Sequence, residues 1–168
     1  MNRGLEQVRD ALAEALSKAG LAVCPAFSPG WAKQYNTPVA AVGLRTGESR
    51  SDAFNSYLGR QFDPETQTTR ELYGMRLELT LSLDVYSPPE TGAAGCDQAL
   101  DILHQVMLEG LPSGLKPTEL RWEETTWDEA SSMFLRRGSS SCSAYFVATA
   151  TEEGAWLTDF ILKGVVTK

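Results

Sequence analysis

The clearest pattern in the chain is an alternation of apolar and polar residues between Leu72 and Tyr86. Such period-two alternation predicts one strand with one dry face and one wet face. Its odd positions, Leu77, Leu79, Leu81, Leu83 and Val85, are apolar, and its even positions are Arg76, Glu78, Thr80, Ser82, Asp84 and Tyr86. At about 3.3 Å per residue the strand would span roughly 50 Å, whereas typical strands span about 17–20 Å. We therefore expect its outer part to extend beyond the core.

The segment before this strand, residues 46–70, is polar and contains a turn signal at Asp63-Pro64-Glu65-Thr66. A single loop of that length is uncommon in a compact domain. The pattern instead favours a hairpin arm, in which one strand runs outward through about residues 53–62, turns, and returns as the long strand. We expect this arm, at approximately residues 46–76, to protrude from the body.

Two segments have helical periodicity. Near the N-terminus, apolar residues recur at spacings of three and four up to Ala19, with Asn2 placed to cap the start and Gly20 following the last turn. Residues 94–109 show the same spacing and are followed by Gly110. Both segments are predicted to form helices that pack an apolar side on the sheet.

The other apolar runs predict further strands. The first covers residues 39–44, and Pro88-Pro89 ends the long strand because proline donates no hydrogen bond to a sheet. Residues 118–127 and 132–150 read as antiparallel strands joined by a polar turn at Asp128–Ser131, and residues 155–166 as a closing strand. The order predicts one α+β domain over residues 1–168, with a largely antiparallel sheet and two main helices packed on it.

Composition narrows the possible partners. The 168 residues carry a net charge of −7, which opposes tight binding to phosphate backbones. The chain has no apolar run near the ~18 residues that a membrane span needs. The N-terminal pattern contains acidic residues and so predicts an amphipathic helix and not a signal peptide, which argues against secretion by the usual route. We expect the three widely spaced cysteines, Cys24, Cys96 and Cys142, to be reduced, buried thiols.

No motif for catalysis, cofactor binding or metal binding emerges. The chain lacks the glycine patterns of nucleotide sites and has one histidine, His104, on the polar flank of the second helix. The serine run before Cys142 could be paired with this histidine as a nucleophile, but an edge segment is the better interpretation. The adjacent pairs Glu123-Glu124 and Glu152-Glu153 favour a solvated face. We therefore predict no catalytic, cofactor or metal residues, and a protein that is not an enzyme.

Aromatic residues and arginines are the remaining candidates for contacts. Trp122 and Trp127 are separated by an odd number of residues, so in one regular strand they would face opposite sides. The pair fits packing under the arm or contact with another subunit. Arg60, Arg70 and Arg136-Arg137 fit a solvated surface, and they would also suit subunit contacts because arginine is frequent at interfaces.

Taken together, these segments resemble the tail terminator, or tail completion, proteins of tailed phages and prophages. The resemblance covers nearly the whole chain and rests on the amphipathic N-terminal helix and the blocks PVAAVGL, YLG…FDPETQTTRELYGMRLELTLSLDVYSP, LHQVMLEGLPSGLK, ELRWEETTWDEASSMF and LTDFILKGV. It implies an α+β subunit that forms a ring, usually a hexamer, at the head-proximal end of the tail tube. Such a ring ends tube polymerisation and presents a surface to the head connector.

The resemblance also implies partners and a location. The chain would bind itself, the tail tube protein and a connector or neck protein, with no cofactor and no membrane, and DNA would pass through the lumen without specific binding. It would be assembled in the host cytoplasm and reside in the virion tail. We take residues 54–76 as the main assembly surface and the turn at Asp128–Ser131 as a second contact. The residues predicted for assembly are Tyr57, Arg60, Phe62, Arg70, Tyr73, Trp127 and Asp128.

Two alternatives remain open at this stage. Another protein of the head–tail junction would share the same diffuse sequence character. A ligand-binding or enzymatic α+β domain would instead contain a deep pocket with converging polar groups.

Overall fold

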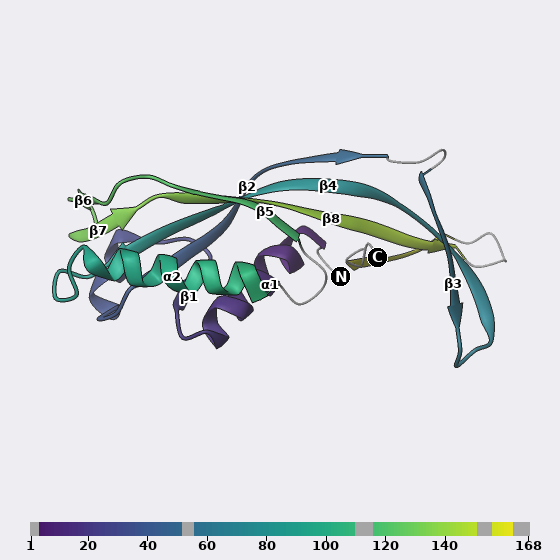
Figure 1. Cartoon of the computed structure of the whole chain (residues 1–168), viewed down its shortest axis with the longest axis horizontal. Helices are drawn as coiled ribbons and strands as arrows, with labels where there is room; N and C mark the ends of the chain where they lie inside the picture. Colours follow the sequence, from purple (N-terminus) through teal and green to yellow (C-terminus); the bar gives the residue numbers. More distant parts are fainter. Residues whose placement is uncertain (1–3, 52–55, 110–115, 151–155, 163–168) are drawn as a thin grey trace.

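A computed structural model describes residues 4–51, 56–109, 116–150 and 156–162. They form an open, mixed sheet with two main helices, so the predicted α+β class is confirmed (Figure 1). The elements in chain order are α1 Gly4–Lys18, β1 Ala22–Cys24, the short helix η1 Pro29–Gln34, β2 Val39–Arg50, β3 Tyr57–Asp63, β4 Thr68–Ser87, α2 Ala94–Glu109, β5 Lys116–Trp122, β6 Thr126–Asp128, β7 Met133–Arg136, β8 Gly138–Ala150 and β9 Trp156–Leu162.

The long strand β4 organises the sheet. It has 20 residues, longer than the stretch that the alternation predicted, because partner strands pair along both of its edges. One edge pairs with β2 and, further out, with β3, and the other edge pairs with β7 and β8. Strand β8 in turn pairs with β5 and β9. Every described pairing is antiparallel except that of β1 with β2.

The core lies between one face of this sheet and the two helices (Figure 1). The predicted dry face is confirmed, since all five odd-numbered side chains from Leu77 to Val85 are buried. Apolar residues of α1 and α2 complete the cluster: Val8, Leu12, Leu16, Ala99, Leu100, Leu103 and Val106. The even-numbered side chains of β4 lie on the opposite face and stay partly exposed in this stretch.

Helix α1 ends as predicted at a glycine. Gly20 has a φ of +92°, a left-handed conformation that a side chain disfavours. Its N–H donates to the carbonyl of Ser17, and the N–H of Leu21 donates to the carbonyl of Leu16, which together form a Schellman ending. Helix α2 has the predicted bounds, while the predicted flanking residues Asn2 and Gly110 lie outside the described residues.

The bounds of several predicted strands were wrong. Strand β2 continues to Arg50 and not to residue 44, because the long partner strand β4 offers pairing positions out to Arg76. Residues 46–50 therefore belong to β2 and pair with β4, and the pairing of β3 with β4 begins at Tyr57. The closing strand β9 is present within the predicted 155–166, of which residues after Leu162 lie outside the described part.

The two predicted strands at 118–127 and 132–150 are each divided in two. Strands β5 and β6 are separated by residues 123–125, and β7 and β8 are separated at Arg137. At this break the N–H of Glu123 donates to the carbonyl of Arg137, and the N–H of Gly138 donates to Asp84 Oδ1. A Cβ at Gly138 would lie 2.8 Å from the carbonyl oxygen of Leu83, so glycine permits this close approach.

Candidate functional site

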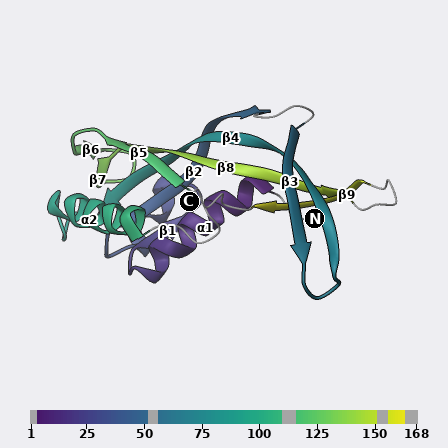
Figure 2. The same ribbon diagram turned by 45° about the vertical axis from the view of Figure 1, so that its right-hand side comes forward.

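The arm consists of β3 and the outer part of β4, and it projects away from the helices (Figures 1 and 2). Its turn is formed as predicted, because Asp63 Oδ1 accepts hydrogen bonds from the N–H groups of Glu65 at 3.0 Å and Thr66 at 3.5 Å. These bonds, led by that from Glu65, hold the pKa of Asp63 below its usual value. The arm is therefore an ordered hairpin with a built turn and not a loose polar loop.

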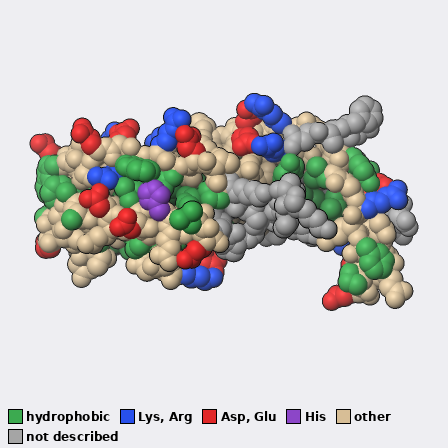
Figure 3. All heavy atoms as spheres, in the orientation of Figure 1, with side chains coloured by type: hydrophobic (Ala, Val, Ile, Leu, Met, Phe, Trp, Pro, Cys, Tyr) green, Lys and Arg blue, Asp and Glu red, His purple; other side chains and the backbone are tan. Residues whose placement is uncertain are grey.

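Aromatic side chains lie on the surface of this arm. The rings of Tyr57 and Tyr73, directly opposite each other on β3 and β4, are 5.5 Å apart and tilted by 66°. The Tyr73 hydroxyl donates to Glu71 Oε2 at 2.8 Å, and this bond raises the pKa of Tyr73. Phe62, near the tip, is 60% exposed. Figure 3 shows hydrophobic side chains on the arm surface, where a large exposed apolar group needs a partner to leave water.

Arginine–carboxylate pairs connect the two strands of the arm. Arg60 lies 3.5 Å from Glu71 Oε1, and Arg70 lies 3.5 Å from Asp63 Oδ2. All four side chains are partly or largely exposed, so each pair contributes little stability. Because each pair joins a residue of β3 to a residue of β4, the pairs are consistent with the register of the hairpin. They also leave these four charges on the arm paired.

The other two predicted residues, Trp127 and Asp128, lie on the β6–β7 hairpin at the opposite end of the sheet from the arm (Figure 1). Asp128 Oδ2 accepts hydrogen bonds from the N–H and the hydroxyl of Ser131, which confirms the predicted turn. Trp127 is 47% exposed, and its ring is 5.1 Å from that of Phe134. The seven predicted residues thus lie on two separate surfaces, the arm and the β6–β7 hairpin.

The prediction that Trp122 and Trp127 face opposite sides was wrong. Trp122 lies 5.1 Å from the ring of His104 on α2, and Trp127 contacts Phe134, which packs against the same helix-covered core. Residues 123–125 interrupt the strand, so the alternation before the break does not continue after it. Both tryptophans remain partly exposed at the margin of the core.

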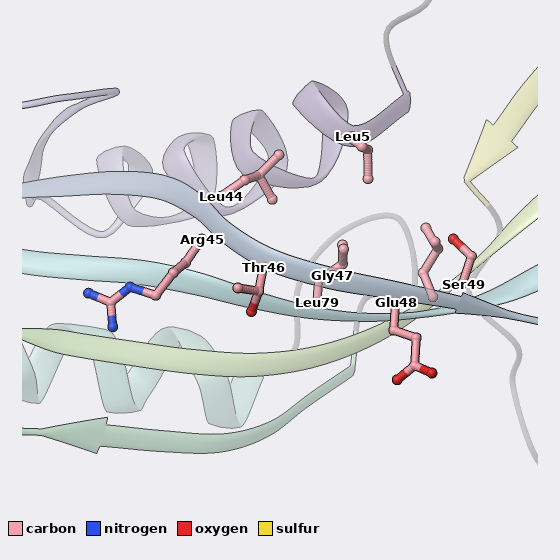
Figure 4. Close-up of a pocket in the computed structure, with 9 residues that line it drawn as sticks. Leu5, Leu44, Arg45, Thr46, Gly47, Glu48, Ser49 and Leu79 are labelled. Atoms are coloured by element: carbon pink, nitrogen blue, oxygen red, sulfur yellow. The ribbon is translucent and has the colours of Figure 1, made fainter.

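A further surface was not predicted. A groove of about 270 Å³ lies between the start of α1 and the outer half of β2. Leu5 and Leu44 line it and are 45% and 37% exposed, while the buried Leu77 and Leu79 also contribute to its lining. In Figure 4, Leu44 points from β2 toward α1, whereas Arg45 and Glu48 point away from the helix. The alternation indicated that Leu77 and Leu79 are buried but gave no sign that α1 stops short of covering β2.

The outer half of β2, beside this groove, is exposed. A Cβ at Gly47 would lie 2.7 Å from Leu79 Cδ2, so the glycine allows the Leu79 side chain to pack closely against β2. Strand β1 pairs only with residues 39–41 of β2, and residues 44–50 are all exposed. In the sequence, Gly47 inside a strand could have indicated a close contact here, since an internal glycine marks a place where another group approaches closely.

The remaining candidates for chemistry among the described residues are a second hollow, the cysteines and His104. The hollow, of about 260 Å³, is lined by Arg45, Arg121 and Arg137 among others. The predicted free, buried cysteines are confirmed, and burial raises the pKa of each thiol, that of Cys142 to about 11. His104 Nδ1 is 2.8 Å from the carbonyl of Leu100, a structural contact. Among the described residues, no three or more His, Cys, Asp or Glu side chains lie together in a way that could hold a metal ion.

Comparison with known proteins gives no family assignment. No protein-family model matches this chain, and no curated protein matches it. In the described part of the chain, no helix has both the length and the apolar character required to cross a bilayer.

Proposed function

We propose that this protein is a structural subunit of a phage or phage-like tail, which forms a ring at the head-proximal end of the tail tube. The ring stops tube polymerisation and presents a surface to the head connector. The observation that carries the proposal is the ordered arm, which extends beyond the helix-covered core on a 20-residue strand and exposes 60% of Phe62 near its tip. The specific role, that of ending the tail tube, is proposed from the resemblance in sequence to tail terminators.

The position of the exposed surfaces supports a ring. The arm with Tyr57 and Phe62 is at one end of the sheet, and the β6–β7 hairpin with Trp127 is at the other (Figure 1). A contact between two different surfaces of identical subunits is heterologous, and it produces a closed ring when the rotation between subunits closes. Such subunits need no catalytic groups.

The sheet face opposite the helices supports passage of DNA without tight binding. Its middle is rich in hydroxyl side chains from β4 and β8, including Thr80, Ser139 and Ser141. Three arginines of the surrounding strands are paired with a glutamate two residues away, at distances of 2.7–2.9 Å: Arg50 with Glu48, Arg76 with Glu78, and Arg121 with Glu119. Paired arginines displace fewer counterions from a phosphate backbone, so we place this face toward the lumen.

A binding assay that varies the number of tube ends tests the proposal. Tubes polymerised from the candidate tail-tube subunit are divided, half are sheared into shorter tubes of equal total mass, and the bound protein is measured after sedimentation. A cap binds only ends, so the bound amount should rise in proportion to the increase in ends. Equal binding to both samples would indicate attachment to the tube wall, and no binding to either would contradict a tube cap.

A further inference from the structure

The second hollow, of about 260 Å³, lies on the sheet face opposite the helices. Ser139 of β8, which lines it, is directly opposite Ser82 of β4 and Arg121 of β5. Residues directly opposite each other on neighbouring strands share a face. Ser82 is one of the even-numbered residues of β4, whose side chains point away from the helices. Small hydroxyl residues therefore occupy the middle of this row, and longer side chains surround it.

Three arginines from different parts of the chain line this hollow. Arg45 comes from β2, Arg121 from β5, and Arg137 from the break between β7 and β8. Arg45 points away from α1 (Figure 4). Arg121 follows Leu120, which packs against the core, so the arginine faces the other side of the sheet. The hollow is therefore bordered by guanidinium side chains from three separate segments.

Two of these arginines remain for a ligand. Arg121 is paired with Glu119 at 2.7 Å. Within the described part of the chain, Arg45 and Arg137 form no ion pair. Ser139 adds a hydroxyl group that can donate a hydrogen bond to an anion.

Carboxylates beside the hollow limit its positive charge. Glu123 also lines it, and Asp84 Oδ1 accepts a hydrogen bond from the N–H of Gly138 at 3.3 Å. Negative charges at this range weaken the attraction between the arginines and an incoming anion. The hollow is therefore suited to a contact that forms and dissociates readily.

The arrangement of donors favours a small tetrahedral anion. An arginine presents a planar fork of N–H donors that matches two oxygens of a carboxylate or a phosphate. Because Arg45 and Arg137 come from different strands, a ligand that engages both needs oxygens pointing in different directions, as a phosphate has. The volume of about 260 Å³ is below the range of about 300–1,000 Å³ for pockets that hold drug-sized ligands, which also favours a small group.

We propose that this hollow is a weak binding site for a phosphate group, held by Arg45 and Arg137 together with the Ser139 hydroxyl. The site is formed within one chain, so it does not depend on the proposed ring. Free phosphate and the phosphodiester backbone of DNA share the chemistry that it recognises. In the proposed ring this face lies toward the lumen, where DNA would supply the phosphate.

Nuclear magnetic resonance of the full-length, ¹⁵N-labelled protein tests the site. The Nε–Hε signals of Arg45 and Arg137 are assigned with the Arg45→Gln and Arg137→Gln variants. They are then followed while chloride is replaced by inorganic phosphate, or by acetate, at constant ionic strength. Phosphate should shift both signals in a saturable manner, and acetate should not. Equal responses to the two anions would overturn a phosphate site in favour of a carboxylate from a protein partner, and an absence of any response would overturn the site altogether.

Two variants with the same loss of charge measure the contribution of the hollow. Arg45→Gln should lower the affinity for inorganic phosphate by about tenfold, because one charge-assisted hydrogen bond is lost. Lys18→Gln removes a positive charge from an exposed side chain on α1 and should bind phosphate as the wild type does. The signal of Arg137 reports the binding in both variants. Equal affinities of the two variants would overturn the role of Arg45.

A short DNA duplex distinguishes the two sources of phosphate. A shift of the same two arginine signals by the duplex identifies the DNA backbone as a ligand of the site. A response to inorganic phosphate alone supports the site and identifies free phosphate as its ligand. These measurements are read from the single chain, so their failure leaves the tube cap untouched, and failure of the tube-end assay leaves the phosphate site untouched.

Discussion

At the level of single residues, the alternation along β4 separates structural from surface positions. The odd-numbered leucines are buried against α1 and α2, whereas Phe62, Leu5 and Leu44 are apolar but exposed. The burial of Leu81 could be predicted because its neighbours at spacing two are also apolar. The exposure of Leu44 could not, because it depends on how much of β2 is covered by α1.

Leu81→Asp should destabilise the protein severely. Leu81 is 1% exposed and lies in the core, so the substitution buries a charge with no partner, at a cost of several kcal/mol. Chemical denaturation monitored by circular dichroism measures the loss. Leu108→Asp, at an 87% exposed position, is the control and should be within about 0.5 kcal/mol of wild type. A cooperative transition near that of wild type for Leu81→Asp would show that the face assignment is wrong.

The buried thiols predict a loss of stability at alkaline pH. Burial raises the pKa of Cys142 from 9.0 to about 11 in the folded protein, so the folded state holds this proton more tightly than the unfolded state does. The resulting stability is fully present below pH 9 and is lost as the pH rises toward 11. The free energy of unfolding should therefore fall across this window, and Cys142→Ala should show a shallower fall. Parallel pH curves for the two proteins would refute this role.

At the level of elements, local signals predicted most of the framework. Helix α2 was predicted with the observed bounds, and Gly20 marked the end of α1. The turn chemistry of Asp63 identified the arm before any contact was known. The short strand β1 was missed because three residues give no periodicity, and the end of β2 was placed too early because residues 45–50 are polar and take their strand conformation from pairing with β4.

Deleting Ser56–Thr68 should remove assembly and preserve the fold. Strand β3 pairs only with β4 among the described strands, and the core cluster contains no arm residue. Circular dichroism and thermal unfolding should resemble those of the full chain, while sedimentation should show loss of the ring or of tube binding. Loss of cooperative unfolding would mean that the segment is part of the core. Unchanged assembly would mean that the arm is not the subunit contact.

At the level of the whole molecule, the sheet is longer than the helix-covered core. The arm and the β6–β7 hairpin are at opposite ends (Figure 1). The groove is lined by residues of α1, β2 and β4. The arm and the second turn could be predicted from the sequence, but the distance between them could not. Their separation follows from the pairing of β4 along both edges, and it favours contacts that repeat from one copy to the next.

Electron microscopy of the purified protein, alone and mixed with its candidate tail-tube subunit, tests the central claim most directly. The account predicts closed rings, rings seated at tube ends, and tubes that are shortened or uniform in length. Tubes of unchanged length and an absence of rings in both samples would contradict a tube cap, and a neck component or a ligand-binding domain would then be the better explanation.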